Sequence, residues 1–374
     1  MKYSPMAIKI LVISDYNHTL PSRPEAEVFL ALDPNEFDIT VMTYGGSYYA
    51  NLFEERGIRV IKFHPKSKFN KEEIAFIRKE LIEGSYDILH LFNSTSIVSG
   101  IRAAKGLPVK VLLYRGYTGN INWWNPAAYL KFLHPRVDKI VCNSKGVEEL
   151  IRRNSIFNRN KCITINKGHR REWYQGHKPI DLQKEGIPAG AFVATFVGNN
   201  RRMKGLPYLL KALKYLPKDI PLHLILVGRN VDTRANLRMV KEGGYSNKVH
   251  FLGFRNDGLD IVASSNIFIL PSIYGESITK SVLEAMSLGV APIITDIPGN
   301  TELVEQGVSG LVVPRKDPKA LADAILHLYK NPELCRQFGQ KSMERIDTVL
   351  NSDLTIEKTA ELYRELYNEK NQPK

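Results

Sequence analysis

The feature that most constrains the fold is a regular alternation of short apolar runs with longer amphipathic segments, which occurs twice along the chain. Short apolar runs bounded by breaker residues predict buried strands. In the first half these are Ile8–Ile13, Asp38–Thr43, Val60–Phe63, Ile88–Leu91, Val109–Leu113 and Lys139–Asn143. Helical patterns lie between them, for example Lys71–Glu83 and Lys145–Asn154. Strands that alternate with helices are typical of a doubly wound α/β sheet.

A second alternation follows a polar and aromatic segment at roughly residues 169–188. Its predicted strands are Phe192–Val197, Leu222–Val227, Val249–Leu252, Ile267–Leu270, Ala291–Thr295 and Gly310–Val313. Its predicted helices include Pro318–Tyr329, Pro332–Arg345 and Thr355–Glu369. A chain of 374 residues is long for one core. We therefore expect two α/β domains, residues 1–175 and 176–349.

Composition limits the compartment and the partners. The longest apolar runs are too short to span a bilayer, and the first residues lack the pattern of a signal peptide. The cysteines Cys142, Cys162 and Cys335 have no metal-binding spacing, which favours a reducing cytoplasm. No zinc-finger, RNP or helix-turn-helix pattern occurs, so we expect no nucleic-acid partner.

The net charge of +13 is concentrated in the first half of the chain. Residues 1–175 carry 26 Lys and Arg against 17 Asp and Glu, and the remaining residues carry 26 against 22. This excess fits a generally basic, solvated surface. It fits equally an attraction to anionic lipid headgroups or to an anionic acceptor.

Two carboxylates, Glu276 and Glu284, follow the predicted strand Ile267–Leu270. Ligands of open α/β sheets bind at the carboxyl ends of the strands. If a helix begins at Ser277, its rise and rotation place the carboxylates roughly 12 Å apart on nearly one face. They would then hold hydroxyls of an extended polyol. The amides of Ser277, Ile278 and Thr279 would face a phosphate between them.

These residues resemble the donor site of a known family. Glu276 and Glu284, running into Leu283-Glu-Ala-Met286, are similar to the Glu-x7-Glu motif of retaining glycosyltransferases of the GT-B fold, family 4. Phe196-Val-Gly-Asn-Asn-Arg-Arg-Met-Lys-Gly205 resembles the family's Gly-Arg-x4-Lys-Gly motif, and Gly307-Val-Ser-Gly-Leu-Val-Val-Pro314 resembles its closing strand. The resemblance implies two Rossmann-like domains facing across a cleft. It also implies a last helix, about residues 350–374, that returns to the first domain.

The resemblance implies roles for individual donor-site residues. Glu284 would bind the ribose hydroxyls and Glu276 the donor sugar, while Lys204 and Arg202 would stabilise the departing diphosphate. The implied catalytic residues are Lys204, Arg202 and Glu276, and the implied donor contacts are Gly198, Asn199, Arg255, Ser277, Ile278, Thr279 and Glu284. Asn199 stands where relatives have an arginine. The plainer alternatives are a helix-terminal acid for Glu276, a surface residue for Glu284 and a polar loop for the others.

The acceptor side of the resemblance is weaker. Its candidates are Asp15, His18, Arg23 and Arg115. Arg115 stands where many relatives have a histidine and is always charged, so it is no general base. It would instead anchor a phosphate or carboxylate, or lie in an ion pair between the domains.

Two further features have open interpretations. His90 fits a packed histidine at a strand end. The aromatic run Trp123-Trp124, followed by Tyr129, Lys131 and Phe132, fits either a rim at a membrane interface or aromatic residues that pack the cleft or core.

The predicted function is transfer of a sugar, with retention, from a nucleotide-diphosphate sugar to a glycan or lipid-linked acceptor. No Asp-x-Asp motif follows a strand, so we predict neither a metal nor a cofactor beyond the co-substrate. We expect a cytoplasmic protein, peripheral on the inner face of the membrane. The alternatives are an epimerase or phosphorylase on the same scaffold, or a GT-B subunit that binds without turnover.

Overall fold

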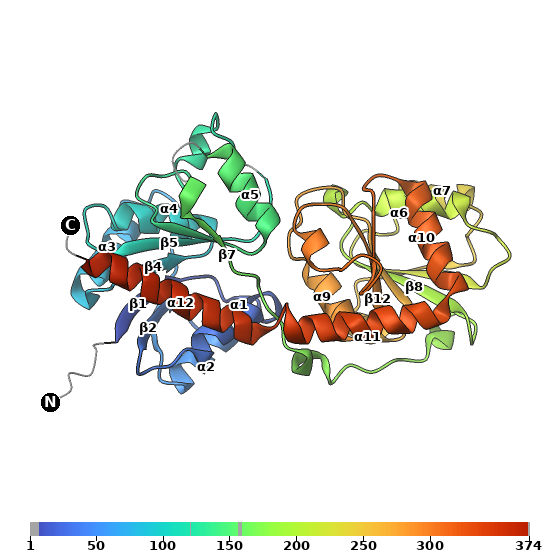
Figure 1. Ribbon diagram of the computed structural model, residues 1–374, viewed down its shortest axis with the longest axis horizontal. Coiled ribbons are helices and arrows are strands. Elements are labelled where there is room, and N and C mark those ends of the chain that lie inside the picture. The colour runs from blue at the N-terminus through green and yellow to red at the C-terminus, as the bar shows by residue number, and fades with distance from the viewer. Residues whose placement is uncertain (1–6, 120, 156–158, 373–374) are drawn as a thin grey trace. The chain divides into compact units, whose positions relative to one another are not determined.

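The structure is a computed structural model that describes residues 7–119, 121–155 and 159–372 (Figure 1). It consists of two compact units. Unit 1 comprises Met1–Gly168 together with Ser352–Lys374, and unit 2 comprises His169–Asn351. In the described ranges, no helix combines the length and the apolar character needed to cross a bilayer.

Unit 1 is built on a parallel sheet of seven strands in the order β3-β2-β1-β4-β5-β6-β7. The strands are β1 (Ile8–Ile13), β2 (Phe37–Thr43), β3 (Arg59–Lys62), β4 (Ile88–Leu91), β5 (Lys110–Arg115), β6 (Lys139–Cys142) and β7 (Cys162–Thr164). The order reverses between β1 and β4, which is the usual place for a ligand site in such sheets. The sequence pattern did not predict β7, because three residues at a sheet edge, of which only Cys162 is buried, give no apolar run.

The helices of unit 1 cover both faces of this sheet. They are α1 (Thr19–Ala31), α2 (Tyr48–Glu55), α3 (Lys71–Gly84), α4 (Ser94–Ala103), α5 (Lys145–Asn154) and α12 (Ser352–Asn371). The last helix, drawn in red in Figure 1, packs along α1, and its Tyr363 and Leu366 are buried in the same core as Ile10 and Val12 of β1. Unit 1 therefore takes one face of its core from the end of the chain.

Unit 2 has a parallel sheet of six strands in the order β10-β9-β8-β11-β12-β13. The strands are β8 (Phe192–Val197), β9 (Leu222–Val227), β10 (Val249–Gly253), β11 (Ile267–Leu270), β12 (Ala291–Thr295) and β13 (Leu311–Val313). The predicted bounds of β8, β9, β11 and β12 are confirmed, since each is a nearly continuous buried run. The helices are α6 (Leu206–Ala212), α7 (Arg234–Glu242), α8 (Gly258–Ala263), α9 (Lys280–Ser287), α10 (Pro318–Lys330) and α11 (Pro332–Thr348).

The boundary between the units lies at Gly168 rather than at residue 175. The backbone amide of His169 donates to the carbonyl of Leu350, at 2.8 Å, and Arg171 forms an ion pair with Asp347 at 3.0 Å. These bonds attach the residues after Gly168 to α11, so they belong to unit 2.

Candidate active site

The loop after β11 carries Glu276, and its geometry differs from the predicted one. Helix α9 begins at Lys280 with Thr279 as its N-cap, whereas the sequence pattern predicted a start at Ser277. Glu276 therefore precedes the helix, and the predicted helical spacing between Glu276 and Glu284 does not hold. The first-turn amides of α9 belong to Lys280 and the residues after it, not to residues 277–279.

Glu276 lies beside the predicted phosphate-binding lysine. The Lys204 Nζ atom is 2.9 Å from Glu276 Oε1, and the two side chains are 17% and 11% exposed. The hydroxyl of Thr279 lies 3.0 Å from Glu276 Oε2. The structure thus brings together two of the three predicted catalytic residues, while the third, Arg202, lies exposed in the same short 3-10 turn as Lys204.

Gly205 explains why Lys204 can approach this loop. Its φ of +68° is strained for other residues, and a Cβ atom there would lie 1.8 Å from the carbonyl oxygen of Pro271. Next to it, the amide of Ile273 donates to the carbonyl of Met203 at 2.8 Å. The loops after the neighbouring strands β8 and β11 are therefore packed backbone to backbone.

Glu284 is buried in α9 and is only 8% exposed, so it is not the surface residue of the plainer interpretation. Lys280, one turn earlier, forms an ion pair with its Oε1 atom. A buried, paired carboxylate held on a helix is suited to accept hydrogen bonds from ligand hydroxyls.

Asn300 extends the site in a way that the sequence pattern did not indicate. Its Oδ1 atom is 2.8 Å from the Thr279 hydroxyl that also contacts Glu276. Asn300 is fully buried, and within the described residues its Nδ2 atom has no hydrogen-bond partner. The one sequence feature that could have indicated Asn300 is its position in Pro298-Gly-Asn300, shortly before the segment Gly307–Pro314 that resembles the family's closing strand.

Two side chains that were predicted to contact the donor sugar-nucleotide are bonded to other residues of the protein. Asn199 Oδ1 accepts a hydrogen bond from the backbone amide of Arg229 at 2.9 Å, so this side chain fixes the neighbouring loop. Arg255 forms ion pairs with Glu185 at 2.9 Å and Asp257 at 2.6 Å. The hydrogen bonds that the guanidinium donates to these carboxylates, Asp257 first, raise the pKa of Arg255.

Gly198 directly follows β8, and its predicted close approach to the ligand stays a prediction. A Cβ atom on Gly228 would lie 2.1 Å from the carbonyl oxygen of Gly198, so the two strand ends of β8 and β9 touch through backbone alone. Ser277 is buried with Thr279, whereas Ile278 is half-buried against the core of unit 2.

Of the acceptor-side candidates, Arg115 has a role that neither prediction anticipated. It is buried, and it donates to the carbonyl oxygens of Tyr117, at 2.9 Å, and Gly119. Its guanidinium lies over the rings of Tyr117 and Phe132, at 3.5 and 4.7 Å. The Arg115 guanidinium is thus held by its own loop, and its predicted role as an anchor for a phosphate or carboxylate stays a prediction.

The other acceptor-side candidates lie near the start of α1. Asp15 is exposed and accepts a hydrogen bond from the amide of Asn17 at 2.9 Å. His18 is exposed at the N-cap, and Arg23 interacts with Tyr49 on α2.

A polar cluster at the carboxyl edge of the unit 1 sheet was not predicted. His64 follows β3 and is buried, with Nε2 2.7 Å from Nδ2 of Asn93 and its ring 4.6 Å from that of Tyr44. Burial lowers the pKa of His64, against the charge of nearby Asp15, which raises it. The signal that could have found it is a His-Pro pair directly after a predicted strand.

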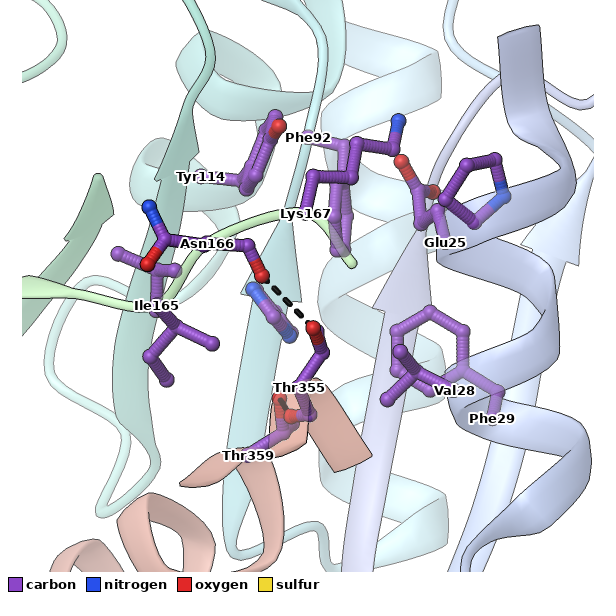
Figure 2. Close-up of a pocket in the computed structure, with 13 residues that line it drawn as sticks. Glu25, Val28, Phe29, Phe92, Tyr114, Ile165, Asn166, Lys167, Thr355 and Thr359 are labelled. Carbon is purple, nitrogen blue, oxygen red and sulfur yellow. Dashed lines mark hydrogen bonds between the residues drawn. The ribbon is translucent and has the colours of Figure 1, made fainter. Parts of the chain in front are cut away.

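A small cavity lies beside this cluster, between α1, α12 and the carboxyl ends of β4 to β6 (Figure 2). Figure 2 shows the Glu25 and Lys167 side chains directed toward each other above it, next to the stacked rings of Phe92 and Tyr114. Desolvation raises the pKa of Glu25, against the attraction of Lys167. A volume of about 40 Å³ has room for a water molecule or two, not for a sugar ring.

No group of three or more His, Cys, Asp or Glu residues is placed to hold a metal ion in the part of the chain that the structure describes.

Two family models match this chain. "Glycosyl transferases group 1" covers residues 177–345 and "Glycosyltransferase Family 4" covers residues 27–172. The chain belongs to the family 4, group 1 glycosyltransferases.

Solved structures of similar fold support the GT-B architecture of this family member. A glycosyltransferase from Rickettsia africae is similar with a TM-score of 0.80 and 19% identity, over 96% of this chain and 98% of that one. Anabaena HepE in complex with UDP has a TM-score of 0.76 and 18% identity, over 96% and 100%.

The alignments with sequence relatives cover a smaller part of this chain than the structural comparisons do. A phosphatidyl-myo-inositol mannosyltransferase of Mycobacterium leprae is 26% identical over 72% of both chains. The chain spans 48% to 61% of the length of other curated relatives that it matches.

Proposed function

We propose that this protein transfers a sugar, with retention, from a nucleotide-diphosphate sugar to an acceptor hydroxyl. The observation that carries the proposal is the contact between Lys204 and Glu276 at the carboxyl edge of the unit 2 sheet, together with the buried Glu284 on α9, the helix that follows this loop. A fixed cation and two carboxylates are the groups that a diphosphate and its two sugars need. The complex of similarly folded HepE with UDP supports a nucleotide at this type of domain.

In the proposed mechanism, the bond between the sugar C1 and the diphosphate oxygen breaks as the acceptor oxygen bonds to C1 on the same face. The acceptor proton passes to the departing phosphate oxygen. Lys204 stabilises the charge that develops on the diphosphate. Glu276 accepts from sugar hydroxyls and Glu284 from ribose hydroxyls. The absence of an Asp-x-Asp motif supports a reaction without a metal.

We propose a lipid-linked or glycan acceptor of the cell envelope, and a cytoplasmic location at the inner face of the membrane. The similarity to the M. leprae relative, a phosphatidyl-myo-inositol mannosyltransferase, supports a lipid acceptor. The basic balance of residues 1–175 supports an anionic surface as a partner.

The test is a thermal-shift panel of UDP, GDP and ADP with their sugar conjugates. A ligand at about 100 times its Kd adds roughly 2.7 kcal/mol to folding stability, which is readily seen. We expect one nucleotide to stabilise the protein and Glu284→Ala to abolish the effect. Glu333→Ala, which removes an exposed carboxylate from α11 of the same unit, is the matched control and should retain it. No response to any nucleotide would overturn the proposal.

A further inference from the structure

The loop after β5 exposes an unusual set of large apolar side chains. Trp123 and Trp124 are 53% and 62% exposed, and Tyr117 and Leu130 are also exposed. The two indole rings meet edge to face at 5.7 Å, and the Tyr129 hydroxyl donates to the carbonyl of Trp123 at 2.8 Å. The two tryptophans therefore do not pack a core, which was one of the two interpretations of this run.

The loop is nevertheless firmly attached to unit 1. Phe132 and Leu133 are buried in the core of the sheet, and Phe132 lies under the guanidinium of Arg115. The same short segment thus buries two residues and presents two tryptophans to solvent. Exposed apolar groups held in place by a rigid base are typical of an interaction surface.

The surroundings of these tryptophans are cationic. No Asp or Glu occurs from Ile88 to Val137, a stretch with six Lys and Arg residues. The Lys131 Nζ atom lies 2.5 Å from the Ser94 hydroxyl at the start of α4. Desolvation lowers the pKa of Lys131, and the nearby charges of Lys68 and Arg115 lower it further.

The loop that carries Lys68 extends this surface along α4. The Ser99 hydroxyl of α4 donates to the carbonyl of Ser67 at 3.1 Å. Phe69 is 51% exposed, and the Arg102 guanidinium lies 4.8 Å from its ring centre. Glu73, an acid close to this loop, accepts hydrogen bonds from the backbone amides of Lys66 and Ser67.

We propose that this cationic aromatic surface docks unit 1 on an anionic lipid bilayer; its residues are Lys68, Phe69, Arg102, Trp123, Trp124 and Lys131. Indole rings favour the headgroup level of a bilayer, and each nearby Lys or Arg adds attraction to anionic lipid. The combination of exposed indoles with cations and no free acid fits a lipid surface better than a folded protein, whose interfaces deplete lysine.

The position of this surface relates it to the proposed reaction. Its loop leaves the carboxyl end of β5, the sheet edge that also carries Asp15, His64 and Asn93. At that edge, unit 1 would contact a lipid-linked acceptor while the lipid part of the acceptor remains in the bilayer. The inference deepens the peripheral location proposed above and rests on the proposed lipid acceptor for its purpose, although binding to vesicles does not require turnover.

The test is co-sedimentation of the full chain with vesicles of phosphatidylcholine, alone or mixed equally with phosphatidylglycerol. We expect binding to the mixed vesicles that weakens with salt. It should fall about tenfold or more in W123A/W124A and in K68E/R102E/K131E. The matched control, K184E/R234E/K330E, makes the same charge change at exposed positions of unit 2 and should bind as the unaltered chain does.

Tryptophan fluorescence shows which part of the chain contacts the vesicles. The chain has three tryptophans, so W173F leaves Trp123 and Trp124 as the only indole reporters. Their emission should shift to the blue on mixed vesicles.

Three results would overturn the inference: no binding to mixed vesicles, an equal loss in the control variant, or a self-association that W123A/W124A abolishes without any vesicle binding. Nucleotide stabilisation measured on the same variants reports on the proposed function separately.

Discussion

At the scale of single residues, the contact between Lys204 and Glu276 has a consequence for kinetics. Without a ligand, Lys204 is neutralised by Glu276 at 2.9 Å. A bound diphosphate must share this cation, so ground-state binding gains little from it. As the glycosidic bond breaks, the charge on the leaving group grows and the attraction to Lys204 grows with it.

We therefore expect Lys204→Ala to lower kcat for donor turnover, including slow hydrolysis, by about 100-fold, with a much smaller change in KM. Lys211→Ala, an exchange of the same kind on the neighbouring helix α6, is the control and should leave both constants unchanged. Equal and small effects of the two substitutions would contradict the assignment of Lys204.

Asn300 acts on Glu276 through Thr279, since the threonine hydroxyl lies between Glu276 Oε2 and Asn300 Oδ1. We expect Asn300→Ala to raise KM for the donor sugar several-fold while the nucleotide diphosphate alone still binds normally, because only the sugar-facing carboxylate loses its orientation. Asn300→Asp keeps the acceptor oxygen and should recover most of the loss. A loss of nucleotide binding in both variants would indicate a purely structural role.

At the scale of elements, the approach of the β8 and β11 loops depends on one glycine. Gly205→Ala would combine a positive φ with a Cβ atom 1.8 Å from the Pro271 carbonyl oxygen. Gly190→Ala has the same backbone strain, at φ +76°, but open space around the Cβ atom. The control should thus cost about 1–2 kcal/mol, and Gly205→Ala more, with loss of nucleotide binding. Chemical denaturation and the thermal-shift assay measure both; similar stabilities would contradict the packing argument.

A buried histidine on β4 gives unit 1 a pH dependence. His90 Nδ1 lies 2.7 Å from the Tyr363 hydroxyl of α12, and burial lowers the pKa of His90 to about 3. Its unfolded pKa is about 6.5. Below that pH the unfolded chain binds a proton that the folded chain does not, so stability falls as pH falls, by up to about 1.4 kcal/mol per pH unit.

The raised pKa of Glu25 acts in the opposite direction in acid, so the comparison must be made with a variant. His90→Gln removes the titrating group. Denaturant unfolding at about pH 7 and about pH 5 should show a smaller loss of stability in the variant than in the unaltered chain. An equal loss in both would show that His90 does not carry the dependence.

The elements also show how far the sequence could be interpreted. Strands such as β8 and β11 were predictable because both faces of a central parallel strand are buried, which leaves an uninterrupted apolar run. The start of α9 was not, because Ser277 and Thr279 are both good N-caps and only the tertiary contact of Thr279 with Asn300 distinguishes them.

The same division applies to the candidate site. Lys204, Glu276 and Glu284 were recognised from a local motif. The contacts of Asn300 with Thr279, and of His64 with Asn93, join segments 21 and 29 residues apart and leave no trace in spacing. The contacts of Arg115 were not predictable because its partners are backbone carbonyls, which every sequence provides.

At the scale of the whole molecule, the two units have separate hydrophobic cores. We expect two transitions in calorimetry, of which a nucleotide raises only the one that belongs to unit 2. At about 100 times its Kd the ligand contributes roughly 2.7 kcal/mol, equivalent to several degrees for a unit of this size. In Glu284→Ala that transition should no longer move. A shift of both transitions would show that the units unfold together.

The place of α12 in unit 1 has a consequence for the order in which the chain is made. A ribosome releases β1 first, yet the core around Ile10 and Val12 lacks Tyr363 and Leu366 until the last residues emerge. Unit 2 has no such gap, since His169–Asn351 is continuous. The half that is synthesised first is therefore completed last, and during translation its open apolar face is the part of the nascent chain most in need of a chaperone.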